Sequence, residues 1–293
     1  MPQVVLTIGG SDSGGGAGIQ ADLKTFSVLG LHGTCAITAI TAQNTLGVQR
    51  VYGLGPEIVV EQLKSITDDF SISFAKTGML HSAEIVIAVA HHLRMTDIPF
   101  VLDPVIEAEA GGRLLRPEAV EALKTHLIPL ARVVTPNIFE AQALTGIEVR
   151  DRDSANQAAQ KILQLGPKAV IVKGGHLDCT DLLMTGEEVI LLPGEKVKGE
   201  NHGVGCTYSA ALTSFLALGS PLKEAARQAK KFAERALFGS MRVGKGVGPV
   251  NQAAYLRQEA NRYRVLCGRY KLVGQGCTKN CSSWSVDYGK RKT

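Results

Sequence analysis

The 293-residue sequence lacks an apolar run of about 18 residues, so hydropathy predicts no transmembrane helix. Its N-terminus has no basic segment followed by a long apolar stretch, and we therefore expect no signal peptide. Cysteine is also scarce: there are six, and Cys35, Cys179 and Cys206 lie far apart in the sequence. Such spacing is not a disulfide framework, which favours a reducing compartment. These absences predict a cytoplasmic protein with no membrane partner.

An excess of one charge is missing from most of the chain. Lys and Arg total 32 and Asp and Glu total 27, which gives a net charge of +5. Residues 267–293 contain six of the basic residues and one acid, which leaves 26 of each sign in residues 1–266. A neutral body argues against a phosphate-backbone footprint, so we expect no nucleic-acid partner. Because three cysteines and the only tryptophan also fall in the last 27 residues, we predict a domain over 1–266 and a disordered, dispensable tail over 267–293.

What the body does contain is a regular alternation of short apolar runs and helical patterns. The runs predict strands over residues 4–8, 34–41, 73–76, 100–103, 132–135 and 169–173, and then a hairpin of 181–184 and 189–192 around Gly186. Helices are predicted over 19–29, 56–70, 82–95, 117–127, 138–144, 154–165, 206–218, 222–241 and 251–264. This alternation predicts an α/β fold, in which helices cover both faces of a mostly parallel sheet.

Glycine and polar residues follow the ends of the predicted strands. The segments concerned are 9–18, 43–44, 78–79, 103–105, 137–140 and 173–176. The carboxyl ends of parallel strands meet at one edge of a sheet, and ligands bind beyond that edge. The sequence therefore predicts a single ligand site built from six strand ends.

The first of these segments is G-G-S-D-S-G-G-G-A-G, residues 9–18. Gly16, Gly18 and Ala21 match the G-x-G-x-x-A pattern of dinucleotide-binding loops, but that fingerprint also needs an acid about 20 residues further on. No Asp or Glu occurs between Asp22 and Glu57, which disfavours a nicotinamide cofactor. A loop whose backbone approaches a small substrate is the preferred interpretation, and a tight turn is the alternative.

The segment N-H-G-V-G-C, residues 201–206, leads into a predicted helix of small residues. The backbone amides of Gly203, Val204, Gly205 and Cys206 can converge at the positive helix end, which is an arrangement suited to a phosphoryl group. The same dipole is expected to lower the pKa of the Cys206 thiol. The alternative is a small buried cysteine at a helix start. His202 and His176 lie in predicted site loops, but their spacing proposes no metal site.

Three charged residues stand at other strand ends. Asp103 and Glu140 are oxygen ligands of the kind that magnesium takes when it bridges nucleotide phosphates. Lys173 ends an apolar strand and can reach a phosphate as a point charge. Two alternatives stay open: Asn137 as a helix cap, and Lys173 as a lysine that extends into solvent.

Seven motifs occur in order between about residues 3 and 250. They are G-G-S-D-S-G-G-G-A-G-I-Q-A-D-L-K-T-F, T-A-I-T-A-Q-N-T-L-G-V-Q, K-T-G-M-L, D-P-V, T-P-N-I-F-E-A, V-K-G-G-H and H-G-V-G-C-T-Y-S-A-A. Together they resemble the hydroxymethylpyrimidine/phosphomethylpyrimidine kinases of thiamine biosynthesis, which belong to the ribokinase-like superfamily. The resemblance implies a three-layer α/β/α fold with a central, mostly parallel sheet.

The resemblance also implies an activity and a substrate site. The activity is ATP-dependent phosphorylation of 4-amino-5-hydroxymethyl-2-methylpyrimidine and then of its monophosphate. By matching position, Asp22 and Gln43 would hydrogen-bond the pyrimidine, and Gly10, Met79 and Val105 would line its pocket. The superfamily commonly forms dimers, so a homodimer is expected.

The same resemblance assigns roles in phosphoryl transfer. Asp103 and Glu140 would serve a magnesium ion, and Asn137 and Lys173 the phosphates of ATP. Cys206 takes the place of the superfamily's catalytic aspartate. We predict that it acts as general base or as aligning group for the substrate hydroxyl.

The sequence departs from the family pattern in two places. Val204 replaces the threonine of the usual H-G-T-G-C, which removes a hydroxyl beside the phosphates but keeps the backbone amide. Glu107 and Glu109 stand where a lysine or threonine and a serine are usual, a pattern compatible with an archaeal-type subgroup.

Two rival functions follow from the same residues. The nearest is a pyridoxal kinase of the same superfamily, although A-Q-N-T at residues 42–45 looks more like the pyrimidine enzymes. The other is a pyrimidine-binding sensor without turnover, against which Asp103, Glu140, Lys173 and Cys206 argue together.

Overall fold

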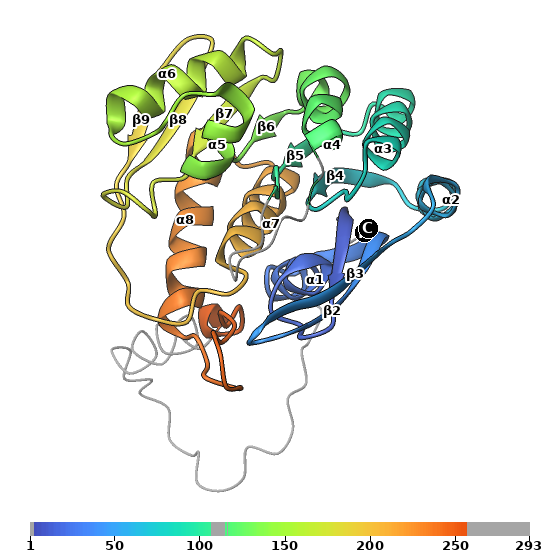
Figure 1. The fold of residues 1–293 in the computed structure, drawn as a ribbon, viewed down its shortest axis with the longest axis horizontal. Helices are drawn as coiled ribbons and strands as arrows, with labels where there is room; N and C mark the ends of the chain where they lie inside the picture. The colour runs from blue at the N-terminus through green and yellow to red at the C-terminus, as the bar shows by residue number, and fades with distance from the viewer. Residues whose placement is uncertain (1–2, 107–114, 116, 257–293) are drawn as a thin grey trace, which may run out of the picture. The chain divides into compact units, whose positions relative to one another are not determined.

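The computed structural model describes residues 3–106, 115 and 117–256 (Figure 1). Its centre is one nine-stranded sheet, in the order β3-β2-β1-β4-β5-β6-β7-β8-β9. The strands are β1 (Val4–Asp12), β2 (His32–Asn44), β3 (Gly47–Gly53), β4 (Ile72–Thr77), β5 (Phe100–Leu102), β6 (Val133–Val134), β7 (Ala169–Val172), β8 (Asp181–Thr185) and β9 (Val189–Leu192).

The middle of the sheet is parallel and its two margins are antiparallel. β2, β1, β4, β5, β6 and β7 pair in parallel, whereas β3 pairs antiparallel with β2. The hairpin predicted around Gly186 is confirmed as β8 and β9, which extend the other margin. The chain leaves β1 for β2 on one side and returns to β4 on the other, so β1 and β4 form the topological switch point at which such folds bind ligands.

Helices cover both faces of this sheet (Figure 1). One face carries α1 (Gly18–Val28), α7 (Val204–Ala217) and α8 (Leu222–Phe238), and the other carries α2 (Pro56–Thr67), α3 (Ala83–Thr96), α4 (Pro117–Ala122), α5 (Ile138–Thr145) and α6 (Arg152–Leu163). The three-layer α/β/α architecture expected from the resemblance is therefore confirmed.

Strand alternation explains why there are two hydrophobic cores. Val101 of β5 packs with the α7 and α8 side, while Phe100 and Leu102, its neighbours in the strand, pack with the opposite core. Val133 and Val134 of β6 divide in the same way. Successive side chains of a strand point to opposite faces, so a continuous apolar run supplies both layers.

Several predicted elements need correction. β1 continues through Asp12, so the first four residues of the predicted 9–18 loop are strand, and β3 was not predicted. The predicted helix over 117–127 is divided into α4 and a π-helical turn, Leu123–Leu127, because its hydrogen-bonding period changes. α8 ends at Phe238, three residues before the expected position.

Several expectations fall outside the described residues. They concern the end of the predicted 251–264 helix, the domain boundary at 266, the tail and the two glutamates Glu107 and Glu109. Within the described ranges, no helix is long and apolar enough to cross a membrane.

Candidate active site

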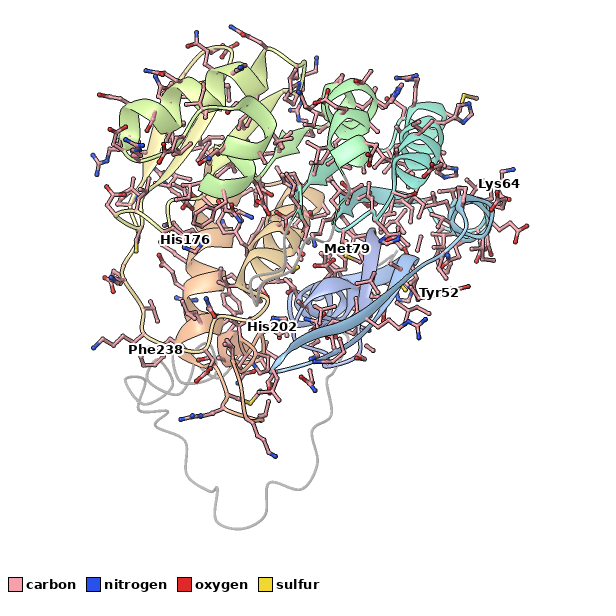
Figure 2. The ribbon with its side chains drawn as sticks, in the orientation of Figure 1. Tyr52, Lys64, Met79, His176, His202 and Phe238 are labelled. Carbon is pink, nitrogen blue, oxygen red and sulfur yellow. The ribbon has the colours of Figure 1, made fainter. Side chains whose placement is uncertain are left out.

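A cavity of about 870 Å³ lies beyond the carboxyl ends of β1, β4, β5, β6 and β7. This volume is typical of pockets that enclose small ligands. Every residue assigned to the site from the sequence lines it: Gly10, Asp22, Gln43, Met79, Asp103, Val105, Asn137, Glu140, Lys173, Gly203, Val204, Gly205 and Cys206. Figure 2 labels Met79, His176 and His202, three lining residues that come from distant parts of the chain. The strand ends that were predicted to form a ligand site therefore meet at one cavity.

One wall of the cavity is the N-terminus of α7. Gly203 caps this helix with φ of +83°, a left-handed conformation that favours glycine. A Cβ at this position would lie 1.9 Å from the carbonyl oxygen of Gly16, so no other residue fits without moving the neighbouring loop. The first amides of a helix have no partner within it. The cavity therefore meets the positive end of a 14-residue helix at Val204, Gly205 and Cys206.

The thiol of Cys206 behaves differently from the sequence-based expectation. Burial raises the pKa of Cys206 to about 12; the Lys76 ammonium opposes this shift, whereas the carboxylates of Asp22 and Asp103 add to it. The prediction of a lowered thiol pKa is therefore wrong, because loss of hydration outweighs the Lys76 ammonium and the hydrogen bond from the Gly18 backbone. Near neutral pH this side chain is a thiol that can donate a hydrogen bond.

Lys173 lies between two carboxylates on the same wall. Its Nζ is 2.9 Å from Oδ1 of Asp103 and 3.9 Å from Oε2 of Glu140. Burial would lower the pKa of Lys173, but Asp103 and then Glu140 raise it above its ordinary value. The side chain is only 14% exposed, so the alternative of a lysine extended into solvent is wrong. Lys173 is a fixed positive charge at the cavity surface.

Hydrogen bonds hold both of these carboxylates in place. Ser209 Oγ donates to Oδ2 of Asp103 at 2.9 Å. Asn137 and Glu140 form a capping box at the start of α5. The backbone N–H of Asn137 donates to Oε2 of Glu140 at 2.7 Å, and the backbone N–H of Glu140 donates to Oδ1 of Asn137 at 2.9 Å. The interpretation of Asn137 as a helix cap is confirmed, and the cap also fixes Glu140 toward Lys173.

The residues expected to serve magnesium do not form a complete protein cage. Over the described ranges, no group of three or more His, Cys, Asp or Glu is placed to hold a metal ion. Asp103 and Glu140 instead flank Lys173 on the cavity wall. Magnesium usually keeps several waters and binds through one or two carboxylates together with substrate phosphates, so this pair suits a metal that arrives with a nucleotide.

A second buried lysine, Lys76, was missed by the sequence analysis. It is 1% exposed, and its Nζ lies 2.7 and 2.8 Å from the two carboxylate oxygens of Asp22. Thr7 donates a further hydrogen bond to Asp22 at 2.6 Å. Burial would lower the pKa of Lys76, but Asp22 raises it above its ordinary value. A lysine inside the predicted 73–76 strand was the available signal, because the apolar neighbours already implied burial.

The remaining predicted substrate residues form a mixed apolar and amide subsite. A Cβ at Gly10 would lie 2.4 Å from Cε of Met79, so the end of the methionine side chain packs directly on this glycine. Thr38 fixes the Met79 backbone by donating to its carbonyl oxygen at 2.6 Å. Thr41 donates to Oε1 of Gln43 at 3.2 Å, which orients that amide.

Comparison with known proteins identifies the family. The sequence model of the family described as phosphomethylpyrimidine kinase matches residues 12–251. The chain belongs to the phosphomethylpyrimidine kinase family.

Three relatives show how far the likeness extends. The hydroxymethylpyrimidine/phosphomethylpyrimidine kinase of Haemophilus influenzae is 49% identical over 264 residues, which cover 86% of this chain and 97% of that protein. The crystal structure of phosphomethylpyrimidine kinase from Clostridium difficile has a TM-score of 0.71 and 44% identity, over 79% of this chain and 97% of that one. An ADP complex of Bacillus subtilis pyridoxal kinase has a TM-score of 0.82 and 38% identity, over 87% of this chain and 99% of that one.

These relatives confirm the ribokinase-like fold of this phosphomethylpyrimidine kinase family member, but fold likeness alone does not select its substrate. The pyridoxal kinase superposes more closely, whereas both phosphomethylpyrimidine kinases are more similar in sequence. Substrate choice depends on the few side chains that touch the substrate.

Proposed function

We propose that this protein transfers the γ-phosphoryl group of ATP to the hydroxymethyl group of 4-amino-5-hydroxymethyl-2-methylpyrimidine, and then phosphorylates the monophosphate, in thiamine biosynthesis. The observation that carries the proposal is the composition of one cavity. It joins a helix N-terminus, a buried lysine between two carboxylates, and an apolar subsite with an oriented amide. Phosphoryl transfer needs these features, because its catalysis consists mainly of positioning and charge stabilisation.

At the phosphate end, the backbone amides of Gly203 and Gly205 would receive the transferring group, whereas the Val204 amide donates to the Asn201 carbonyl oxygen at 3.0 Å. Lys173 would neutralise charge on the neighbouring phosphates, with Asn137 beside it. Val204 lacks the usual threonine hydroxyl and its amide already has an acceptor, so the anion hole would depend on the two glycine amides. Removal of one such preorganised donor typically slows a reaction by about 10²–10³-fold.

Cys206 would align the substrate hydroxyl toward the phosphoryl group. Its raised pKa favours this role over that of a general base in the unliganded protein, because a thiol with a pKa of about 12 is almost fully protonated near pH 7. Cys206→Ala should lower kcat by about 10²-fold, and Cys206→Ser should retain more activity, since a hydroxyl can still hydrogen-bond. Near wild-type turnover by Cys206→Ala would refute the assignment.

Magnesium is part of the proposal. Asp103 and Glu140 would hold it together with the nucleotide, and the ion would supply charge neutralisation of the phosphates when bound. Lys173 holds both carboxylates near the phosphate end without the ion.

At the substrate end, Gln43 and Asp22 would form hydrogen bonds with the edge of the pyrimidine. Gly10, Met79 and Val105 would line the pocket around the ring. Asp22 already accepts hydrogen bonds from Lys76 and Thr7. A carboxylate offers about four acceptor sites, so the ion pair leaves capacity for an amino group of the ring.

The second candidate is a pyridoxal kinase, which the TM-score of 0.82 to such an enzyme favours. A phosphate-transfer assay with the pyrimidine alcohol, its monophosphate and pyridoxal, each with and without magnesium, tests the proposal. We expect both pyrimidines to be phosphorylated with a higher kcat/KM than pyridoxal, and only with magnesium. Preference for pyridoxal would support the second candidate, and binding of the pyrimidine without ATP consumption would support a sensor.

Three further parts of the proposal concern the whole protein. We place it in the cytoplasm as a homodimer, with residues 267–293 dispensable for activity. Ile40 and Tyr52 on β2 and β3 are 49% and 67% exposed and offer apolar surface for the second copy. Light scattering of the purified protein would test the dimer, and a chain ending at Leu266 should keep its kcat.

A further inference from the structure

One side-chain pair ties two loops of the cavity together. Asp12, the last residue of β1, accepts hydrogen bonds from the backbone amides of Gly14, Gly16 and Ala17 at 2.8, 3.0 and 2.8 Å. Nε2 of His202 lies 2.9 Å from Oδ2 of the same carboxylate. Residues 13–17, here called the glycine loop, therefore share one acceptor with the loop of residues 201–205, here called the anion-hole loop.

The chemistry of Asp12 determines which group donates in this contact. Burial would raise its pKa, but the hydrogen bonds from His202 and from the Ala17 and Gly14 amides lower it to about 2. Asp12 is thus ionised and accepts only, so Nε2 of His202 carries the hydrogen. That nitrogen cannot then accept from Nε2 of Gln43, 3.4 Å away, which leaves the Gln43 amide hydrogens available for a ligand.

The glycine loop and the anion-hole loop pack so closely that two of their glycines leave no room for a side chain. A Cβ at Gly16 would lie 2.3 Å from Cδ2 of His202, in addition to the contact of Gly203 with the Gly16 carbonyl. The backbone of His202 is held by two further hydrogen bonds. Its amide donates to the Gly248 carbonyl at 3.2 Å, and the Val250 amide donates to the His202 carbonyl at 3.1 Å. A shift of His202 would therefore move both loops relative to each other.

We propose that Asp12 and His202 are positioning residues for phosphoryl transfer, which fix the substrate subsite at Gly10 and Gln43 relative to the anion hole at residues 203–206. The proposal rests on the proposed function. The reacting atoms must approach to about 3–3.5 Å, and a misplacement of about 1 Å can slow a reaction 10²-fold. Because the pair acts between the two subsites, its loss should reduce kcat more than the affinity for either substrate.

The test compares His202→Ala with His202→Gln, whose amide can still donate to Asp12. We expect kcat of His202→Ala to fall about 10–100-fold, with each KM within about threefold of wild type. We expect His202→Gln to recover most of the lost rate. His91→Ala, at an exposed position on α3, is the matched control and should keep its kcat. Wild-type kcat in His202→Ala, a loss confined to KM, or no rescue by glutamine would each overturn the proposal.

A second readout does not depend on catalysis. In hydrogen exchange of the unliganded full-length protein, His202→Ala should speed the exchange of amides in the glycine loop and in the anion-hole loop together, and His202→Gln should restore both. Unchanged protection of the glycine loop would contradict the coupling. If wild-type protein phosphorylates neither the pyrimidine nor pyridoxal but the exchange result holds, the proposed function fails while the structural coupling stands.

Discussion

The two buried lysines of the cavity occupy different environments. Lys76, at the substrate end, is 1% exposed and pairs with the single carboxylate of Asp22. Lys173, at the phosphate end, is 14% exposed and lies between Asp103 and Glu140. Both lysines line the cavity, but Lys76 is almost fully buried against its partner, whereas Lys173 is more exposed. We therefore expect the more deeply buried lysine to act mainly on the stability of the fold, and the more exposed lysine to act mainly on the chemistry.

Replacement of the accessible lysine should have the largest effect. Lys173→Met removes the fixed charge beside the phosphates, so kcat/KM should fall about 10³-fold, which corresponds to about 4 kcal/mol of lost transition-state stabilisation. Steady-state kinetics with the pyrimidine alcohol measure it. Lys64→Met, at an exposed position on α2, is the matched control. A tenfold loss or less would mean that Lys173 is scaffold as well.

The more deeply buried lysine, Lys76, should act mainly on stability. Lys76→Met leaves the buried carboxylate of Asp22 without its counter-charge, so the free energy of unfolding should fall by about 3 kcal/mol. The double variant Lys76→Met with Asp22→Leu removes both charges and should regain most of that loss. Urea denaturation followed by circular dichroism measures both. A single variant as stable as wild type would contradict the distinction between the two lysines.

Asp12 is a buried carboxylate that, unlike Asp22 and Asp103, is paired with backbone amides and a histidine instead of a lysine. Its pKa of about 2 in the folded protein lies below the ordinary 3.8, so ionised Asp12 stabilises the fold above about pH 4, and this contribution is lost as the pH falls to about 2. The shift corresponds to about 2 kcal/mol. The difference in unfolding free energy between wild type and Asp12→Asn should therefore shrink over that interval. A difference independent of pH would show that the hydrogen bonds do not favour the ionised form.

The smallest effect is expected from the hydroxyl that orients Asp103. Ser209→Ala removes its hydrogen bond to Oδ2 while Lys173 still holds Oδ1, so kcat/KM should fall about tenfold. Ser214→Ala is the matched control: this buried serine of α7 donates only to the Ala210 carbonyl, away from the cavity. Equal losses in the two variants would indicate a general defect of α7 instead of an oriented carboxylate.

The fold could be predicted from local patterns alone. β-branched runs, helical periods and signals such as the Ser82 cap of α3 depend on neighbouring residues, and the resulting alternation determined the layers. β3 was missed because this edge strand is half exposed and lacks a continuous apolar run. The end of β1 was misjudged because glycine can adopt strand as well as loop conformations.

The residues assigned to the site from the sequence and from the family resemblance all line one cavity, although Lys76, Asp12 and His202 line it as well. How the charges of these residues are matched depends on the tertiary structure. Lys76 meets Asp22 across 54 positions, and His202 meets Asp12 across 190, distances over which no periodicity carries information. It likewise decided the protonation of Cys206, because desolvation depends on everything that surrounds a group and not on its place at a helix end.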